Sequence, residues 1–306
     1  MEFFSPDSWA EALAIRAAHP DATPIAGGTD LMVDINFDRR RPAALLDLTR
    51  VPELTSWRRD GGTVRIGAGV PYARIITELA GLVPGLAKAS RTVGSAQIRN
   101  RGTVGGNLAS ASPAGDALPP LLAAGAVVEV ASVRGRRRIP AAEFCTGVKR
   151  SALAADELVA AVELPVAPGP QEFAKVGTRN AMVIAVCSVA VALDPAARAI
   201  GTGIGSAAPT PRRATAAEEF AAAELADSWG PAADLDPAVA RRFGELVAAA
   251  ADPIDDVRGT AAYRRHALAV LGRRTLSWAW ADYQAGRGAA ADRPGAGPGP
   301  TGGGDR

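Results

Sequence analysis

The stretch that decides the fold is Thr103-Val104-Gly105-Gly106-Asn107, followed nine residues later by Asp116. A second glycine turn, Ala26-Gly27-Gly28-Thr29-Asp30, lies far upstream and repeats the combination of glycines, a threonine hydroxyl and a polar side chain. Glycine lets backbone N–H groups approach a ligand closely, and successive amides in such turns form concave anion sites. A single Gly-Gly pair usually marks only a tight turn. Two such turns, converging in the fold, would hold a diphosphate, with Asn107 and Asp116 bonding the hydroxyls of a sugar or sugar alcohol.

The composition is that of an ordinary globular protein, and the length allows about two domains. The net charge of +2 gives no global electrostatic reason to expect nucleic-acid binding. Arg134 and the run Arg136 to Arg138 stand between apolar segments, and we expect a solvated hairpin turn there. The longest apolar runs fall well short of a membrane span, and the N-terminus has no basic segment typical of a signal peptide. We therefore expect a cytoplasmic protein that binds neither nucleic acid nor a membrane.

The cysteines and histidines are few and far apart. Cys145 and Cys187 form no CxxC pair, and His19 and His266 are the only histidines in the sequence. The chain therefore lacks the spacing of a zinc or iron–sulfur site of its own. A Walker A motif is also absent, and Gly67-Ala68-Gly69, which ends an alternating strand, lacks the third glycine of a GxGxxG dinucleotide fingerprint. If a dinucleotide binds here, the fold is not a Rossmann fold.

Hydrophobic periodicity and turn residues predict the elements that surround these motifs. A helix over 7–19 precedes a βαβ-like unit (strand 23–26, helix 30–37, strand 45–48), so the first glycine turn directly follows a strand. Next come a strand over 63–69, helices over 72–79, 82–89 and 116–124, and strands over 127–132 and 157–164. Residues 94–115 between them are expected to be a long irregular stretch, which in a compact domain is usually functional.

A Pro-rich boundary at residues 165–170 separates these elements from a C-terminal group. There the pattern predicts strands over 172–176, 183–193 and 199–205, and helices over 214–225, 237–250 and 260–283. The tail from Gly286 has no apolar side chain larger than alanine, so we expect it to be disordered.

Several ordered motifs carry a resemblance to a known family. They are Pro-Ile-Ala-Gly-Gly-Thr-Asp-Leu (24–31), Gln-Ile-Arg-Asn-Arg-Gly-Thr-Val-Gly-Gly-Asn-Leu (97–108), Ala-Ser-Pro-Ala-Gly-Asp (111–116), Phe-Ala-Lys-Val-Gly-Thr-Arg (173–179), Gly-Ser-Ala-Ala-Pro-Thr-Pro (205–211) and Tyr-Arg-Arg (263–265). Through them the chain resembles, over about residues 1–282, the FAD-binding (medium) subunit of the molybdenum hydroxylases, of the xanthine dehydrogenase or carbon monoxide dehydrogenase type.

The resemblance implies an α+β protein. Residues 1–168 would form an FAD-binding domain of the vanillyl-alcohol-oxidase (PCMH) type, with subdomains of about residues 1–58 and 59–168. Residues 169–284 would form a C-terminal α+β domain, a three-stranded antiparallel sheet with helices, and residues 285–306 a disordered tail.

The resemblance also implies which residues bind the cofactor. The two glycine turns would grip the FAD pyrophosphate and Asp116 the ribityl chain, with Val159 packed near the isoalloxazine and Lys175 near its polar edge. The full set is Pro24, Ile25, Ala26, Gly27, Gly28, Thr29, Asp30, Leu31, Thr103, Val104, Gly105, Gly106, Asn107, Asp116, Val159 and Lys175. An ammonium group would stabilise the anion of a reduced flavin, and the flavin itself would be the redox centre.

Some of these residues have an ordinary structural alternative. Lys175 also suits a strand-end lysine that reaches solvent, and Asp30 suits a helix cap. Arg99 and Arg101 flank the second turn, where they would either balance phosphate charge or lie on the surface. Arg179 would either pair near the flavin or belong to an exposed turn.

The implied function is that of an electron relay. Substrate would be oxidised on a large subunit with a molybdenum-pterin cofactor, electrons would pass through a small [2Fe-2S] subunit, and the FAD here would deliver them to NAD+. The resemblance suggests a dimer of heterotrimers. The motifs at 34–38 and 175–186 look most like the xanthine/purine dehydrogenase type, with carbon monoxide, aldehyde and N-heterocycle dehydrogenases as alternatives. The run at 180–183 lacks an acidic residue that relatives often carry, which leaves O2 and a quinone open as acceptors beside NAD+.

Two other functions are open at this point. A self-sufficient FAD oxidoreductase of the same fold would need its own acid or base above the flavin, and both histidines lie outside the motifs. A scaffold protein that has lost FAD would not need the intact glycines, Asn107 and Asp116.

Overall fold

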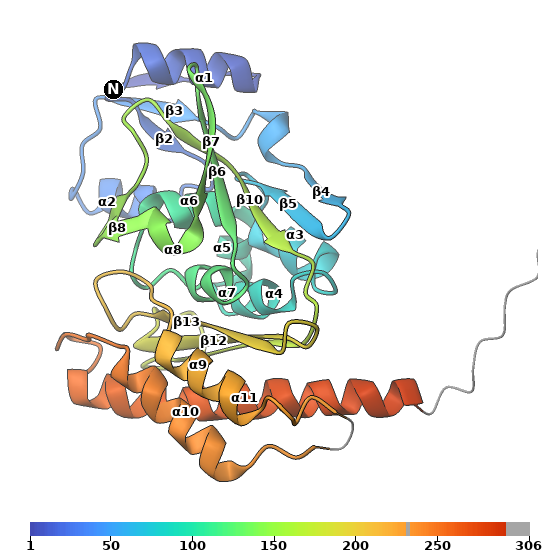
Figure 1. Ribbon diagram of the computed structural model, residues 1–306. Helices are drawn as coiled ribbons and strands as arrows, with labels where there is room; N and C mark the ends of the chain where they lie inside the picture. Colours follow the sequence, from blue (N-terminus) through green and yellow to red (C-terminus); the bar gives the residue numbers. More distant parts are fainter. Residues whose placement is uncertain (231–232, 292–306) are drawn as a thin grey trace, which may run out of the picture.

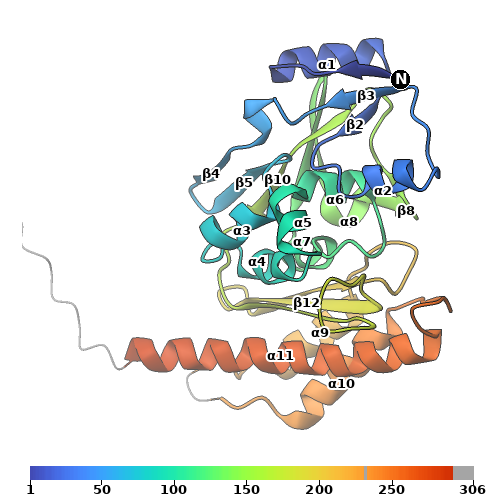
Figure 2. The ribbon, with the colours of Figure 1, turned by 180° about the vertical axis from the view of Figure 1, so that it is seen from behind.

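A computed structural model describes residues 1–230 and 233–291 of the chain (Figure 1). Figures 1 and 2 show that α4 (Pro84–Arg91) and α7 (Leu118–Ala123) lie on one face of a C-terminal sheet. Helices α9 (Thr215–Glu224) and α11 (Ala261–Ala291) cover its other face, and α10 (Pro237–Ala249) packs against these two helices. This mixture of sheets and helices agrees with the predicted α+β class. None of the helices in the described part of the chain has an apolar stretch sufficient to cross a membrane.

The first sheet is small and parallel. Its strands lie in the order β1 (Glu2–Phe4), β3 (Ala44–Asp47), β2 (Thr23–Ile25). Helix α1 (Trp9–Ala18) leads to β2, and α2 (Leu31–Asn36) joins β2 to β3. The predicted βαβ-like unit is confirmed, and it places the first glycine turn between β2 and α2. Strand β1, which the sequence pattern does not predict, is too short to show a periodicity.

The second sheet is antiparallel. Its strands lie in the order β4 (Trp57–Asp60), β5 (Thr63–Gly67), β10 (Leu158–Pro165), β6 (Val127–Ser132), β7 (Gly135–Pro140), and a 3-10 turn, η1 (Pro52–Leu54), precedes β4. The connection from β7 to β10 contains α8 (Ala141–Phe144) and a hairpin of β8 (Cys145–Gly147) with β9 (Arg150–Ser151). Strand β10 pairs with both β5 and β6, so it joins segments far apart in sequence.

The arginine run belongs to an exposed hairpin, as the sequence predicts: β6 and β7 pair antiparallel and turn at residues 133–134, and Arg134 and Arg136 to Arg138 are exposed. Three of its arginines lie on β7, and each arginine of the run pairs with a carboxylate: Arg134 with Asp156, Arg136 with Glu129, Arg137 with Glu157 and Arg138 with Glu163. Two of these partners lie on β6 and β10, the strands beside β7 or beyond it. The hairpin prediction is therefore confirmed, and the carboxylate partners that balance these charges across the sheet are an addition that the sequence does not reveal.

Residues 94–115 are not an irregular stretch, contrary to the prediction. They contain two short helices, α5 (Ala96–Arg101) and α6 (Val104–Ser110). The hydroxyl of Ser95 caps the first helix and that of Thr103 caps the second. Hydroxyl and glycine residues suit loops, but they also satisfy the free N–H groups at a helix start. The same residues that suggest a loop therefore begin helices here.

The third sheet is antiparallel, with strands β11 (Gln171–Val176), β12 (Cys187–Asp194) and β13 (Ala199–Gly205). The predicted three-stranded sheet is confirmed, although residues 183–186 belong to the preceding loop rather than to β12. Helix α11 continues to Ala291, into the start of the tail for which disorder is predicted. The rest of the predicted tail, residues 292–306, lies outside the described residues.

Two glycines on β13 bring the third sheet against α7. A Cβ on Gly203 would overlap the carbonyl oxygen of Pro119, and a Cβ on Gly201 would overlap that of Ala123. The strand and the helix therefore touch through backbone atoms, an approach that a larger residue prevents. This close contact fixes the position of α7 relative to the C-terminal sheet.

Candidate functional site

The structure brings the two glycine turns together. A Cβ on Gly27 would overlap the carbonyl oxygen of Arg101, and a Cβ on Gly102 would lie 3.3 Å from Oγ1 of Thr29. Backbone meets backbone at this point, which requires glycine. The convergence inferred from the sequence is therefore present, with the end of α5 against the segment that joins β2 to α2.

The first turn has unused backbone donors. Gly28 adopts φ +72°, a left-handed conformation that glycine tolerates best. The backbone N–H groups of residues 27–30 donate to no acceptor among the described residues, so they are available to a ligand. The exposed Asp30 side chain makes no capping hydrogen bond with α2, so it does not act as the helix cap considered above.

The two glycines of the second turn have different surroundings. The Gly105 amide donates to the carbonyl oxygen of Ala68 at 3.1 Å, and a Cβ on Gly105 would overlap Ala68. Gly106 is exposed, and a Cβ there would meet only Oγ1 of Thr103, at 3.1 Å. Gly105 is therefore needed for packing, whereas Gly106 faces open space.

Asn107 connects the second turn to the segment that carries Asp116. Its Oδ1 accepts a hydrogen bond from the Ala117 amide at 3.3 Å. A Cβ on Gly115 would lie 2.7 Å from the same oxygen, so this glycine lets the amide side chain in. Asn107 thus holds the start of α7, and with it Asp116, beside α6.

Asp116 is a buried carboxylate with one free oxygen. Its Oδ2 lies 2.5 Å from Nζ of Lys175 and 3.4 Å from Oγ1 of Thr92. Its Oδ1 is enclosed and has no partner within the described residues. Burial raises the pKa of Asp116, while the charge and hydrogen bond of Lys175 and the hydroxyl of Thr92 oppose that rise. An enclosed acceptor without a donor is costly unless a water or ligand supplies one.

Lys175 does not reach solvent, so the simple strand-end alternative is wrong. Its side chain is 9% exposed and lies at the boundary between β11 and the N-terminal elements. Besides Asp116, its ammonium donates to the carbonyl oxygens of Thr92 at 2.9 Å and Val183 at 3.2 Å. Its three N–H donors therefore all have protein acceptors.

Tyr72 is a residue of this site that the sequence analysis does not single out. It begins α3 (Tyr72–Glu78), and its amide donates to the Gly102 carbonyl at 3.0 Å. Its hydroxyl is buried and, within the described ranges, unpaired. Burial raises the pKa of Tyr72, and the negative charge of Asp116 raises it further. In a sequence, an aromatic residue at the start of a helix is most simply interpreted as a core residue. Only the unpaired hydroxyl, seen in the structure, indicates that Tyr72 belongs to the site.

Three other predicted residues differ in their surroundings. Val159 is buried in the core on β10, opposite Val130, at a β-bulge. The guanidinium of Arg179 donates to the Met182 carbonyl within its own exposed turn. Arg101 has an exposed side chain that is free to approach an anion.

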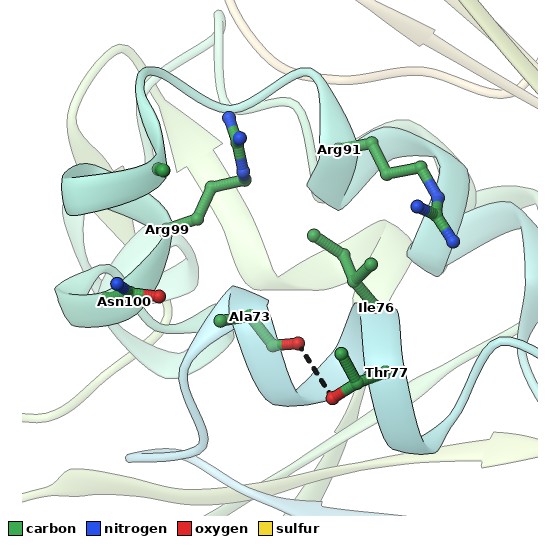
Figure 3. A pocket seen from close by; sticks show the side chains of 7 residues that line it. Ala73, Ile76, Thr77, Arg91, Arg99 and Asn100 are labelled. Carbon is green, nitrogen blue, oxygen red and sulfur yellow. Dashed lines mark hydrogen bonds between the residues drawn. The ribbon is translucent and has the colours of Figure 1, made fainter.

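Arg99 holds a turn and lines a separate pocket. Its guanidinium donates to the carbonyl oxygens of Val93 at 3.1 Å and Gly94 at 3.0 Å. Figure 3 shows Arg99 at a cavity of about 330 Å³ between α3, α4 and α5, which is also lined by Ala73, Ile76, Thr77, Arg91, Ala96 and Asn100. The cofactor-binding residues expected from the sequence do not line this cavity.

The arrangement around the two turns fits a ligand with a diphosphate and a polyol. Free amides in the first turn suit anionic oxygens, and the open face of Gly106 leaves room for them. The unpaired Oδ1 of Asp116 suits a ligand hydroxyl.

Comparison with known proteins identifies the family. Residues 1–167 match the FAD binding domain in molybdopterin dehydrogenase. The chain belongs to this family of FAD-binding subunits. Residues 172–279 of the subunit match the CO dehydrogenase flavoprotein C-terminal domain.

Individual relatives agree with this assignment. The subunit is 34% identical to the nicotine 6-hydroxylase medium subunit of Paenarthrobacter nicotinovorans, over 90% of this chain and 96% of the relative. It is 36% identical to the nicotinate dehydrogenase FAD-subunit of Eubacterium barkeri, over 64% and 70%. Identity to the xanthine dehydrogenase FAD-binding subunit of Escherichia coli O157:H7 is 28%, over 88% and 92%.

A solved structure has the same fold. The carbon monoxide dehydrogenase of Hydrogenophaga pseudoflava contains a chain that superposes with a TM-score of 0.84. The superposition covers 92% of this FAD-binding subunit and 98% of that chain, at 28% identity.

Proposed function

We propose that this chain is the FAD-carrying electron-transfer subunit of a molybdenum hydroxylase. The observation that carries the proposal is the contact of the first glycine turn with Arg101 and Gly102, which places its free amides beside the start of the second turn. Asn107 of the second turn in turn holds the segment of Asp116, whose Oδ1 is unpaired among the described residues. Membership in the family supplies the ligand that fits them, FAD.

The proposed roles follow the local structure. Residues 24–31 and 103–107 would hold the diphosphate, because one turn offers amides and the other an open glycine face. Asp116 would accept a hydrogen bond from the ribityl chain. Val159 and Lys175 would lie beyond the ribityl chain, toward the ring system. Since every donor of Lys175 is already used, its influence on the ring would be one of charge.

The proposed partners come with the family. Bound FAD would supply the redox chemistry, receiving electrons from a small [2Fe-2S] subunit and passing them to NAD+. A large subunit would carry the molybdenum-pterin cofactor, and the complex would be a dimer of heterotrimers in the cytoplasm. This chain would hold and orient the flavin, and its activity would depend on those partners.

The substrate of the complex is proposed at the level of a class. The sequence motifs favour a xanthine or purine dehydrogenase. A second candidate is another dehydrogenase of N-heteroaromatic rings, because identity is higher to the nicotine and nicotinate enzymes than to the xanthine dehydrogenase subunit. Activity of the reconstituted complex on xanthine, nicotinate and nicotine would separate the two.

The first test is an absorption spectrum of the purified chain, with chromatographic identification of any flavin released by acid. We expect one non-covalent FAD per chain, either as purified or after addition of FAD. A colourless protein that refuses added FAD would contradict the proposal and favour a scaffold. Oxidation of a small alcohol by the lone chain would favour a self-sufficient oxidoreductase.

Asp116→Ala is expected to weaken FAD binding by about 1–3 kcal/mol, the usual range for a lost charge-assisted hydrogen bond. Isothermal titration of the apo-protein with FAD measures the change. Denaturant unfolding is measured in parallel, because Lys175 loses its carboxylate partner. Asp60→Ala, at an exposed position on β4, is the control. An unchanged dissociation constant for Asp116→Ala would remove this residue from the site.

A further inference from the structure

Lys175 joins three segments that are distant in sequence. Its ammonium donates to the Thr92 carbonyl at the end of α4, to Oδ2 of Asp116 just before α7, and to the Val183 carbonyl in the loop after β11. We call this loop, residues 177–186, the β11–β12 loop. The ammonium therefore ties the loop to the part of the chain that carries the glycine turns.

The β11–β12 loop is held through its carbonyl oxygens by cations. The Met182 carbonyl accepts from the guanidinium of Arg179, and the Val186 carbonyl accepts from Nη1 of Arg264 at 2.8 Å. Arg179 belongs to the loop, and Arg264 belongs to α11. Of the three cations that hold the loop, Lys175 is the one that also bonds to the N-terminal elements. Met182 at the loop tip has φ +51° and an exposed side chain.

We propose that Lys175 is a positioning residue that couples occupancy of the flavin site to the order of the β11–β12 loop, through Asp116. The two oxygens of Asp116 have different partners. Oδ2 faces Lys175, whereas the enclosed Oδ1 is unpaired among the described residues. The coupling rests on the proposed function, because a ligand hydroxyl must satisfy Oδ1.

The coupling arises because the ligand hydroxyl and Lys175 would bond to the two oxygens of one carboxylate, that of Asp116. A hydroxyl bound to Oδ1 restricts rotation of the carboxylate and keeps Oδ2 toward Lys175. A buried ion pair is most stable when its remaining polar atoms are also bonded. Lys175 then stays in place to hold the Val183 carbonyl. The effect is reciprocal. If bound ligand shifts the loop toward its ordered state by some factor, the ordered loop raises the affinity of the site for the ligand by the same factor.

Limited trypsin digestion reads the order of the loop directly. Arg179 is exposed within the loop, so a first cut after it releases a fragment that begins at Asn180, identified by mass spectrometry. Cleavage of a native protein tracks the population of the locally open form when opening is fast. We expect added FAD to slow this cut in the wild-type chain by about fivefold or more, as loop opening becomes rarer.

The test variant is the charge-neutral pair K175M/D116N, which avoids leaving one buried charge alone. Without FAD, we expect cleavage after Arg179 to be on the order of tenfold faster than in the wild type, because the loop has lost its tie. D116N alone keeps the bond from Lys175 to Val183. Because it leaves the buried ammonium without a counter-charge, its rate of cleavage without FAD should lie between those of the wild type and K175M/D116N. At an FAD concentration that saturates the variant, it should lose most of the protection by FAD.

Lys88→Met is the matched control. Lys88 also forms an ion pair across the same boundary, with Glu172 on β11, but it does not bond to the loop. Lys88→Met should therefore leave the rate of cleavage after Arg179 within about twofold of the wild-type rate. Lys175→Arg retains a cation that can reach Asp116, so it should restore part of the protection.

Two results would overturn the coupling. One is an unchanged rate of cleavage after Arg179 in K175M/D116N without FAD. The other is equal protection by FAD in the wild type and in D116N. A wild-type chain that binds no FAD would instead contradict the proposed function. The comparison without FAD would then still decide whether Lys175 ties the loop.

Discussion

Gly106→Leu is expected to abolish FAD retention while leaving a folded protein. Gly106 is exposed, and among the described residues a Cβ at this position would meet only Oγ1 of Thr103. A leucine would fill the space that the proposed diphosphate needs. Loss of more than about a hundredfold in affinity, equal to roughly 2.7 kcal/mol, is expected in an FAD titration.

The stability of this variant should not fall. Gly106 lies in the first turn of α6, where leucine has a higher helix propensity than glycine by up to about 1 kcal/mol. Gly81→Leu is the matched control, because a Cβ at exposed Gly81 meets nothing within 4 Å. Full flavin occupancy in Gly106→Leu would show that the diphosphate does not lie against the second turn.

Gly203→Val is expected to destabilise the chain more than any flavin-site substitution proposed above. The new side chain would overlap the Pro119 carbonyl, a backbone atom of α7 that cannot rotate away. Strand β13 and α7 must then separate, and we expect a loss of about 3 kcal/mol or more in the free energy of unfolding. Denaturant unfolding of the apo-protein measures this loss without reference to the cofactor.

A control substitution, at a glycine whose Cβ position is open, separates this effect from the general cost of replacing glycine with valine. Gly62, in the turn between β4 and β5, has nothing within 4 Å of a Cβ. Gly62→Val should change the free energy of unfolding by about 1 kcal/mol or less. Equal stability of Gly203→Val and wild type would mean that α7 and β13 are not in backbone contact.

The sequence predicts those parts of the fold whose chemistry is local. The strand that ends in the first glycine turn, the three-stranded C-terminal sheet and most helices follow from periodicity and turn residues. Asp116 also stands out, because a carboxylate near a glycine turn is a recognisable combination. Element boundaries follow less closely: residues 183–186 have a strand-like composition but lie in a loop, since their carbonyls bond to side chains instead of a neighbouring strand.

Other parts depend on contacts that a sequence does not display. Gly105 and Gly106 are adjacent and chemically identical, yet one packs against Ala68 and the other faces open space. Tyr72 looks like a core residue until its hydroxyl is found enclosed and, among the described residues, unpaired. The position of Lys175 also depends on tertiary contacts, since two of its acceptors, on Thr92 and Asp116, are far away in the chain.

The backbone contact between α7 and β13 also links the two halves of the chain. Sequence comparison separates the chain into two matching regions, with α7 in the first and β13 in the second. The two regions therefore pack against each other through backbone atoms at this contact. Any sliding of the C-terminal sheet must carry α7 with it, and α7 begins two residues after Asp116. A displacement of the C-terminal sheet would therefore be transmitted through α7 to the segment that carries Asp116.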